Sequence, residues 1–226
     1  MITAEEIKSI VLNLGADKCG IAGTDRFSSA PKGFRPTDVY SKCMSVLVFL
    51  KRMPPEVIRA DNPVPYSHTA DLLYSALDQL GLKICSELEK QSIHCVPVPT
   101  DVPYLYYDAE IKHGMGIISL RHAAFNAGLG ILGRNTLLIN SDYGNMVYIG
   151  AILIDTELEP DPVANDFSCP PNCELCLDSC PTKALDGVTV NQKSCREFSY
   201  IQHPRGWDIY TCNECRKVCI FRTGKK

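Results

Sequence analysis

The sequence lacks the features that usually mark membrane-bound, exported and polyanion-binding proteins. Its longest nearly apolar run, MVYIGAILI at 146–154, is far shorter than the roughly 20 residues that a helix needs to span a bilayer. The start, MITAEEIKSI, has no basic region followed by an apolar core. The 23 basic and 26 acidic residues give a formal net charge of −3, so no excess of positive charge favours nucleic acid. We therefore expect a soluble, cytoplasmic protein without a nucleic-acid or membrane partner.

Cysteine, by contrast, is abundant, and its distribution divides the chain. There are 12 cysteines among 226 residues, and in a reducing compartment such thiols usually serve metal or redox chemistry. Eight of them lie between 169 and 219, whereas the others are scattered and are expected to be small buried hydrophobic residues: Cys19, Cys43, Cys85 and Cys95. Near Asp161 the sequence becomes rich in proline and loses its periodicity. We expect one domain over 1–160 and a second over 161–226.

The first region alternates between helical and strand patterns, which predicts an α/β (α+β) fold. A capping box of Thr3 and Glu6 opens a helix that ends near Gly15. The strongest helix signal covers 69–90, where Leu72, Leu73, Ala76, Leu77, Leu80, Ile84 and Leu88 predict an inward face. A shorter helix is expected at 119–128, a loop at 103–116, and strands at 18–23, 43–50, 94–100, 135–139 and 146–154.

The clustered cysteines form two related motifs. The first, Cys169-x3-Cys173-x2-Cys176-x3-Cys180-Pro181, is one residue longer at its first gap than the bacterial ferredoxin run. The second consists of Cys195, far upstream, followed by Cys212-x2-Cys215-x3-Cys219. Eight thiolates are the number that two [4Fe-4S] clusters require.

The ferredoxin pattern also predicts how these thiolates divide, because the fourth cysteine of each run binds the other cluster. One expected ligand set is Cys169, Cys173, Cys176 and Cys219, and the other is Cys195, Cys212, Cys215 and Cys180. The alternative is a pair of structural zinc sites, since C-x2-C twice over also fits zinc. The paired C-x2-C-x3-C pattern favours the clusters.

Five segments carry a resemblance to a known family. In chain order they are AGLGILGRNTLLIN, YIGAILIDTELEPD, CELCLDSCPTKAL, CREFSYIQ and YTCNECRKVC. In order and register they resemble the epoxyqueuosine reductase family of iron-sulfur proteins, over roughly Arg121 to Cys219 and more loosely before it. The chain resembles a short, divergent member, related also to cobalamin-dependent reductive dehalogenases.

The resemblance implies a nitroreductase-like α/β domain that binds base-off cobalamin, followed by a small ferredoxin-like domain with two [4Fe-4S] clusters. It further implies that electrons pass from a donor such as ferredoxin or flavodoxin through the clusters to cobalt. Arg134, Asn135 and Thr136 follow the Gly-rich turn and are expected beside the corrinoid, where they either bind it or only cap a turn. Ser119 and Arg121 precede or begin a short helix and either face the same cavity or, in the case of Ser119, cap the helix.

The chain also departs from the family pattern. Gly114 stands where the family has a catalytic aspartate, so the catalytic residue is unknown. Four nearby residues either substitute for this aspartate or are ordinary loop residues: Asp108, Glu110, His113 and His122. The sequence ends at CIFRTGKK, without the helical-repeat region of transfer-RNA-modifying members. These departures predict a substrate other than epoxyqueuosine.

Two rival functions follow from the same residues. One is a non-catalytic, ferredoxin-like carrier that reduces a partner corrinoid protein or enzyme, which the missing aspartate favours. The other replaces the corrinoid with FMN. A nicotinamide site is not expected, although Gly128-x-Gly130-x-x-Gly133 matches the dinucleotide fingerprint, because the helix precedes these glycines and the strand follows them.

Overall fold

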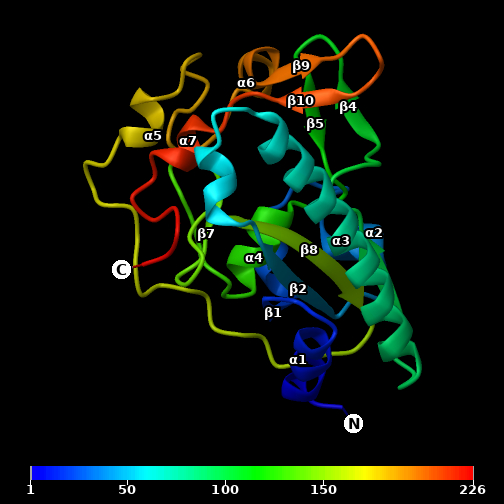
Figure 1. The fold of residues 1–226 in the computed structure, drawn as a ribbon. Helices are drawn as coiled ribbons and strands as arrows, with labels where there is room; N and C mark the ends of the chain where they lie inside the picture. The colour runs from blue at the N-terminus through cyan, green and yellow to red at the C-terminus, as the bar shows by residue number, and fades with distance from the viewer. Residues whose placement is uncertain (1, 226) are drawn as a thin grey trace.

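An antiparallel sheet in the order β1-β2-β8-β3 forms the centre of the fold in the computed structural model, which describes residues 2–225 (Figure 1). Its strands are β1 (Lys18–Gly23), β2 (Ser45–Arg52), β3 (Cys95–Val98) and β8 (Val147–Ile154). Three small ladders accompany it: β4 (Tyr106–Asp108) with β5 (His113–Met115), β6 (Ile131–Leu132) with β7 (Leu138–Ile139), and β9 (Tyr200–Gln202) with β10 (Asp208–Tyr210).

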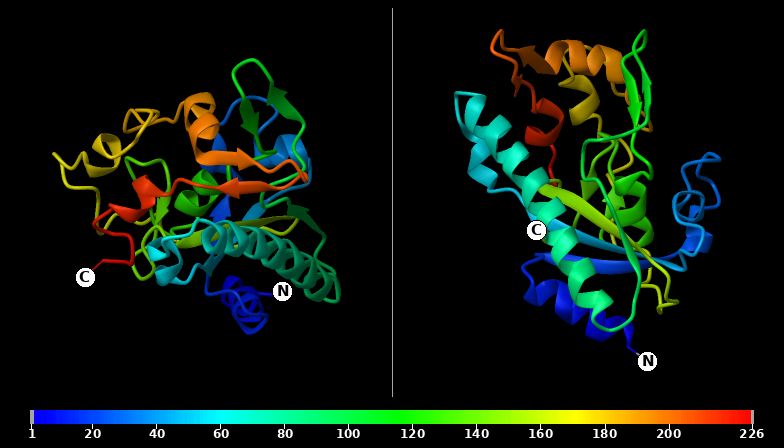
Figure 2. Two further views of the ribbon diagram at one scale, coloured as in Figure 1. Left: turned by 45° about the horizontal axis from the view of Figure 1, so that its top comes forward. Right: turned by 90° about the vertical axis from the view of Figure 1, so that its right-hand side faces the viewer.

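Helices cover both faces of the central sheet, so the fold is mixed α/β. The helices of the first region are α1 (Ala4–Asn13), α2 (Pro36–Val39), α3 (Val64–Glu89) and α4 (Leu120–Asn126), with 3-10 turns η1 (Thr24–Phe27) and η2 (Pro55–Arg59). Helices α1 and α3 pack on one face and α4 on the other, as the right-hand view of Figure 2 shows. Among residues 2–225, no helix is both long and apolar enough to cross a membrane.

The alternation of side chains along β2 explains why both faces are covered. Leu47 and Phe49 belong to the core cluster beneath α1 and α3, whereas Val46, Val48 and Leu50 belong to the cluster beneath α4. All five are 0–1% exposed. Because successive strand residues point to opposite faces, a strand that is apolar throughout requires a cover on each side.

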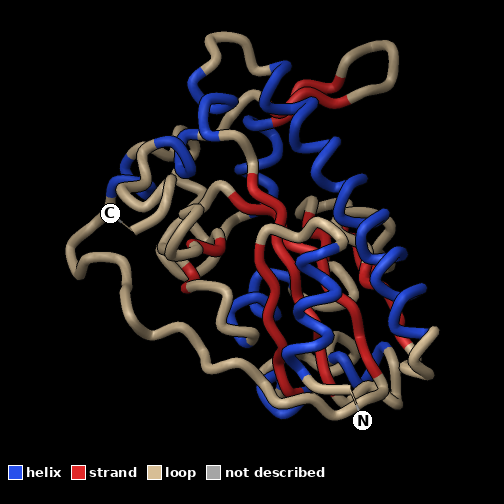
Figure 3. Tube along the Cα trace, turned by 60° about the horizontal axis from the view of Figure 1, so that its bottom comes forward, coloured by secondary structure: helices blue, strands red, loops and turns tan. Residues whose placement is uncertain are grey.

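The cysteine-rich region lies beyond one end of the sheet and consists mostly of loops and short elements (Figure 3). Its helices are α5 (Leu175–Asp178), α6 (Gln192–Ser199) and α7 (Glu214–Lys217). The chain enters this region through Asp161, whose side chain accepts hydrogen bonds from Lys8 Nζ and from the backbone of Ile21, both at 2.8 Å. The start of the region is thereby bonded to the first helix and first strand.

Most of the expected elements are confirmed. The opening helix has Thr3 as N-cap with a complete capping box, and the strands at 18–23, 94–100 and 146–154 occur with small changes of boundary. The strand expected at 43–50 runs from Ser45 to Arg52, and the short helix at 119–128 is α4.

Other expectations are wrong in part. The long helix begins at Val64 rather than at 69. Pro65 is tolerated in its first turn, because the N–H that proline lacks would have no partner within the helix at that position. On its surface Leu72 is 55% exposed and Ala76 is exposed, so the buried face is narrower than predicted. The loop expected at 103–116 contains the β4–β5 hairpin. The strand expected at 135–139 is only β7, and β6 precedes it unforeseen.

The Gly-rich turn joins a helix to a strand, as the sequence predicted. Gly128 and Gly130 follow α4 with φ angles of 72° and 153°, a region that L-residues with a side chain seldom adopt. A Cβ on Gly130 would lie 2.2 Å from the carbonyl oxygen of Ile139, so the two backbone segments approach too closely for any side chain. This local order is the reverse of a dinucleotide-binding turn.

Candidate functional site

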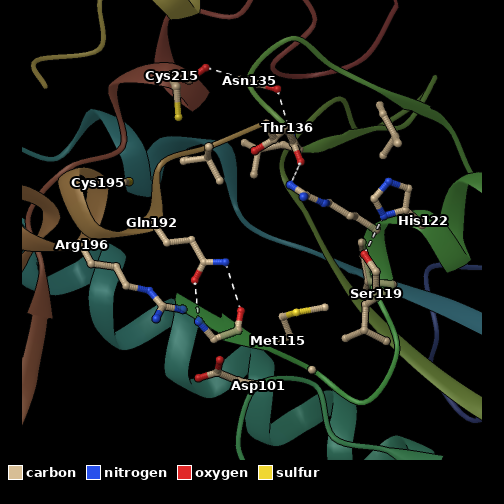
Figure 4. A pocket seen from close by; sticks show the side chains of 18 of the residues that line it. Asp101, Met115, Ser119, His122, Asn135, Thr136, Gln192, Cys195, Arg196 and Cys215 are labelled. Atoms are coloured by element: carbon tan, nitrogen blue, oxygen red, sulfur yellow. Dashed lines mark hydrogen bonds between the residues drawn. The ribbon is translucent and has the colours of Figure 1, made fainter. Parts of the chain in front are cut away.

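A large open cavity lies between the sheet and the cysteine-rich region (Figure 4). Its volume is about 940 Å³, near the upper end of the roughly 300–1,000 Å³ typical of cofactor and small-molecule pockets. One wall comes from β8 and the start of α4, another from the β4–β5 hairpin, and a third from α6 and α7. The cavity is therefore built jointly by both regions of the chain.

Four cysteines line this cavity, and we call them the cavity group: Cys180, Cys195, Cys212 and Cys215. They come from three separate stretches of the cysteine-rich region and are free thiols. The Sγ of Cys180 accepts a hydrogen bond from the backbone N–H of Ala184 at 3.3 Å. The structure thus brings together the set that sequence spacing assigned to one cluster.

The other four cysteines line a second, smaller pocket, and we call them the pocket group: Cys169, Cys173, Cys176 and Cys219. They too are free thiols. Cys219 comes from the far end of the region and joins the three cysteines of the first motif because α5 and α7 pack against each other. The two groups match the two sets expected from the ferredoxin pattern.

Burial and local hydrogen bonds give these thiols different pKa values. Burial raises the pKa of Cys215 to about 12, and it also raises those of Cys212, Cys176 and Cys219. Burial acts in the same direction on Cys180, but hydrogen bonds from Ala184 and Thr182 outweigh it and lower the pKa of that thiol. Binding of a metal by the buried thiols therefore requires the release of protons.

Within residues 2–225, no three His, Cys, Asp or Glu side chains lie close enough together to hold one metal ion. In a tetrahedral zinc site all four ligands converge on one ion. In a four-iron cluster the four cysteines are shared among four irons, so their sulfurs surround a larger body.

Two of the residues that follow the Gly-rich turn lie at the cysteine groups. Asn135 is 3% exposed and lines both the cavity and the smaller pocket, and its Nδ2 donates to the carbonyl oxygen of Cys215 at 3.1 Å. Arg134 lies at the smaller pocket, where it donates to the carbonyl of Cys173 at 3.1 Å and pairs with Glu174 at 3.2 Å. Asn135 therefore lies between the two groups, and Arg134 braces the pocket group.

The remaining predicted cofactor residues line the large cavity (Figure 4). Arg121 donates from Nη1 to the carbonyl oxygen of Thr136 at 3.0 Å, and burial lowers the pKa of its guanidinium. Thr136 has a positive φ of 63°. Ser119 occupies the N-cap position of α4 without the capping bond, because its Oγ lies 2.7 Å from Nδ1 of His122 instead. Burial and the neighbouring Arg121 lower the pKa of His122.

The hairpin position expected to carry the catalytic carboxylate is held firmly without one. Gly114 donates its N–H to Gln192 Oε1 and accepts from Gln192 Nε2, both at 3.1 Å, so α6 clamps the hairpin (Figure 4). A Cβ at this position would lie 2.7 Å from the ring of Tyr104. The space where a side chain would begin is already filled by this tyrosine.

The four candidate substitutes for that carboxylate divide into two pairs. His113 and His122 line the cavity. Asp108 instead accepts hydrogen bonds from the backbone N–H groups of Glu110 and Ile111 at 3.0 and 3.1 Å, which is a turn within the hairpin. Glu110 is exposed.

Sequence reasoning missed several cavity residues. Asp101 is an exposed residue that faces the cavity beside Arg196, and partial loss of hydration there raises the pKa of its carboxyl group (Figure 4). No pattern in the sequence distinguishes Asp101 from other loop carboxylates. Arg216 is different, because its position inside the motif CNECRKVC could have pointed to it.

Sequence comparison places the chain beside proteins of one name. An epoxyqueuosine reductase of Staphylococcus aureus is 36% identical over 131 residues, which are 52% of this chain and 33% of that protein. The epoxyqueuosine reductase of Aliivibrio fischeri is 29% identical over 160 residues, covering 66% of this chain and 38% of the relative. No family model matches. The chain resembles epoxyqueuosine reductases.

Solved structures share the fold over almost the whole chain. The epoxyqueuosine reductase of Streptococcus thermophilus has a TM-score of 0.70 at 20% identity, covering 98% of this chain and 66% of that one. A catabolic reductive dehalogenase in complex with 3-bromo-4-hydroxybenzoic acid has a TM-score of 0.69 at 18% identity, covering 98% and 32%. The resemblance predicted from the motifs is confirmed, and the chain spans about a third of the length of the first curated relative.

Proposed function

We propose that this protein is an iron-sulfur oxidoreductase that passes single electrons through two [4Fe-4S] clusters to a corrinoid in the large cavity. One observation carries the proposal: the cavity group forms part of the wall of a cavity of about 940 Å³. A cluster bound there would lie directly beside any cofactor in the cavity. The redox chemistry of the chain's relatives, which are named as reductases and reductive dehalogenases, agrees with this arrangement.

The donor set fits the two clusters. Each group supplies four free cysteines, which is the ligand count of a [4Fe-4S] cluster. The N–H of Ala184, directed at Cys180, is the kind of hydrogen bond that stabilises a thiolate ligand. We assign the pocket group to one cluster and the cavity group to the other.

Residues of the first region would hold the corrinoid. Ser119, Arg121 and Thr136 line the cavity opposite the cysteines, and their polar groups suit the amides and phosphate of such a ligand. The aromatic rings of Tyr104 and Phe125 add apolar lining. A bound corrinoid supplies a metal centre that exchanges single electrons. One solved relative is a reductive dehalogenase whose structure suggests a mechanism for B12-dependent dehalogenation.

The two regions take separate roles in this proposal. Residues 1–160 form a nitroreductase-like domain that binds the cofactor, and 161–226 form a ferredoxin-like domain that holds both clusters. Clusters held by the two groups would supply single-electron transfer, with a donor such as ferredoxin or flavodoxin at the pocket group and the cofactor at the cavity group. Asn135 lies between the two groups, since it lines both sites and donates to the carbonyl of Cys215.

The hairpin favours a substrate other than epoxyqueuosine. One relative is described in complex with an epoxyqueuosine-modified transfer-RNA stem loop. In this chain Gly114 replaces the carboxylate that the family resemblance places there, and Tyr104 fills the adjoining space. We therefore do not extend the RNA substrate to this protein.

A second candidate rests on the same hairpin. Without a proton donor at 114, the protein could serve as an electron carrier that reduces a partner corrinoid protein. In that case the cavity would receive a group presented by the partner instead of a resident cofactor.

Anaerobic purification with analysis of iron, sulfide, cobalt, zinc and flavin per chain tests the proposal. We expect about eight iron and eight sulfide per chain, a brown colour, and a base-off spectrum when cobalamin is titrated into the reconstituted protein. Cys212→Ala and Cys173→Ala should each remove about half of the iron, since they belong to different groups.

Other outcomes separate the alternatives. A fully loaded protein that never gives a base-off spectrum, yet reduces a corrinoid protein, would establish the carrier. Stoichiometric FMN would replace the corrinoid with flavin. Colourless protein with stoichiometric zinc would overturn the cluster assignment itself.

A further inference from the structure

Arg216 is a buried cation without a carboxylate partner. It lies between Cys215 and Cys219 on α7, is 7% exposed, and lines the large cavity with the cavity group. Within residues 2–225, no Asp or Glu oxygen lies within ion-pair distance of its guanidinium. Buried charges in proteins are normally paired or coordinate metals, because an unpaired one costs several kcal/mol.

The surroundings of Arg216 fix its position with neutral groups only. Its Nη1 donates to the carbonyl oxygen of Asn145, and the Nδ2 of Asn145 donates in return to the carbonyl oxygen of Arg216 at 3.2 Å. The guanidinium carbon lies 5.5 Å from the centre of the Tyr148 ring, in cation–π geometry. These contacts hold the cation rigidly but do not neutralise it.

The pocket group presents a contrast. The cation beside it, Arg134, is paired with Glu174 at 3.2 Å, and its side chain is 29% exposed. Solvent and a carboxylate therefore weaken the field of Arg134, whereas the field of Arg216 acts through low-dielectric surroundings. Of these two cations, Arg216 alone has no carboxylate within ion-pair distance among residues 2–225.

A [4Fe-4S] cluster with four thiolates is negatively charged and gains a further negative charge on reduction. A fixed cation nearby stabilises the reduced form more than the oxidised form and so raises the reduction potential, for which net charge and burial are recognised determinants. We propose that Arg216 is the counter-charge of the cluster held by the cavity group and sets its potential above that of the pocket-group cluster. This inference rests on the proposed function, and it makes electron flow towards the cavity favourable.

The test is an anaerobic redox titration of the reconstituted protein monitored by electron paramagnetic resonance. The signal of the cavity-group cluster is the one that Cys212→Ala removes. In Arg216→Met we expect the ratio of reduced to oxidised cluster at a fixed applied potential to fall by at least tenfold, which is about 59 mV for a one-electron couple. In Arg216→Lys, which keeps the charge, the ratio of reduced to oxidised cluster should fall by less than threefold.

Lys217→Met is the matched control. Lys217 is the next cation on α7, but its side chain is 48% exposed and lies 3.9 Å from Glu214, so its removal should change the ratio by less than twofold. An unchanged or higher potential in Arg216→Met, with both clusters loaded, overturns the inference and leaves the proposed function intact.

Loss of the cluster is also informative. If Arg216→Met and Arg216→Gln lose the cavity-group iron while Arg216→Lys retains it, the charge itself holds the cluster, which supports the inference. If Arg216→Lys loses the iron as well, the shape of the side chain matters and the counter-charge role is wrong. Absence of this cluster from the unsubstituted protein would instead overturn the proposed function, and iron analysis of that protein distinguishes the two failures.

Discussion

The two regions of the chain bury very different side chains. In the first, apolar clusters cover both faces of the sheet, and its fully buried side chains include Phe49, Leu77 and Ile152. Among residues 161–225 the buried hydrophobic residues are Cys176, Cys180 and Ala184. A segment of this length cannot be stabilised by so little apolar burial.

The comparison indicates that the first region is stabilised by its own core, whereas the second depends on what it contacts and binds. Contacts with the first region, such as those of Asn135 and Gln192, supply part of the stability. Under the proposed function, the two clusters would supply the rest, because the free energy of metal binding contributes to folding in small metal-binding domains.

If the proposed clusters are bound, their removal is expected to have the largest effect. Treating the anaerobic protein with an iron chelator should accelerate backbone amide exchange over 167–222 by at least about tenfold, while exchange in β2 and β8 changes little. Hydrogen exchange with mass spectrometry measures both regions in one sample. Equal protection of 167–222 with and without iron would contradict the conclusion that the second region depends on what it binds.

Truncation in the core of the first region comes next. Leu77 on α3 is 1% exposed, so Leu77→Ala should lower the free energy of unfolding by about 2–5 kcal/mol. Leu72 on the same helix is 55% exposed, and Leu72→Ala should cost less than about 0.5 kcal/mol. Denaturant unfolding compares the pair, and similar losses in both variants would show that the buried face of α3 is misassigned.

Loss of a contact between the regions should have an intermediate effect. Asn135→Ala leaves the carbonyl of Cys215 without its donor, and we expect a loss of about 1–3 kcal/mol. The exposed Asn172 lies in the cysteine-rich region and offers a control, since Asn172→Ala should stay within about 0.5 kcal/mol of the unsubstituted protein. Anaerobic denaturation of the loaded protein measures both, and a neutral Asn135→Ala would argue against a structural link at this residue.

The smallest effect is a pH dependence from the cavity wall. Because burial and Arg121 lower the pKa of His122 below its ordinary value of 6.5, the folded state binds fewer protons than the unfolded state as the pH falls below that value. Stability from this group is therefore present above pH 6.5 and declines on acidification. Between about pH 8 and 5.5 the midpoint of thermal unfolding should decline less in His122→Gln than in the unsubstituted protein. An equal decline in both proteins would contradict a lowered pKa for His122.

Much of the fold was predictable because it depends on local patterns. The capping box of Thr3 and Glu6 set the start of α1, and runs of apolar residues indicated the strands β2 and β8. The β4–β5 hairpin within 103–116 was not predicted, and its clamp by Gln192 on Gly114 joins residues 78 positions apart, which no local pattern reveals.

The sequence by itself predicted how the eight cysteines divide into two sets, because their spacing is a local property of the chain and the ferredoxin pattern assigns the fourth cysteine of each run to the other set. Only the tertiary structure decided that one group lines the cavity and the other a separate pocket, and that Arg134 and Asn135 donate to backbone carbonyls of the two groups. It also decided that Arg216 is buried with no carboxylate of residues 2–225 within ion-pair distance. The physical reason is that burial, dielectric surroundings and charge pairing depend on which distant segments pack together.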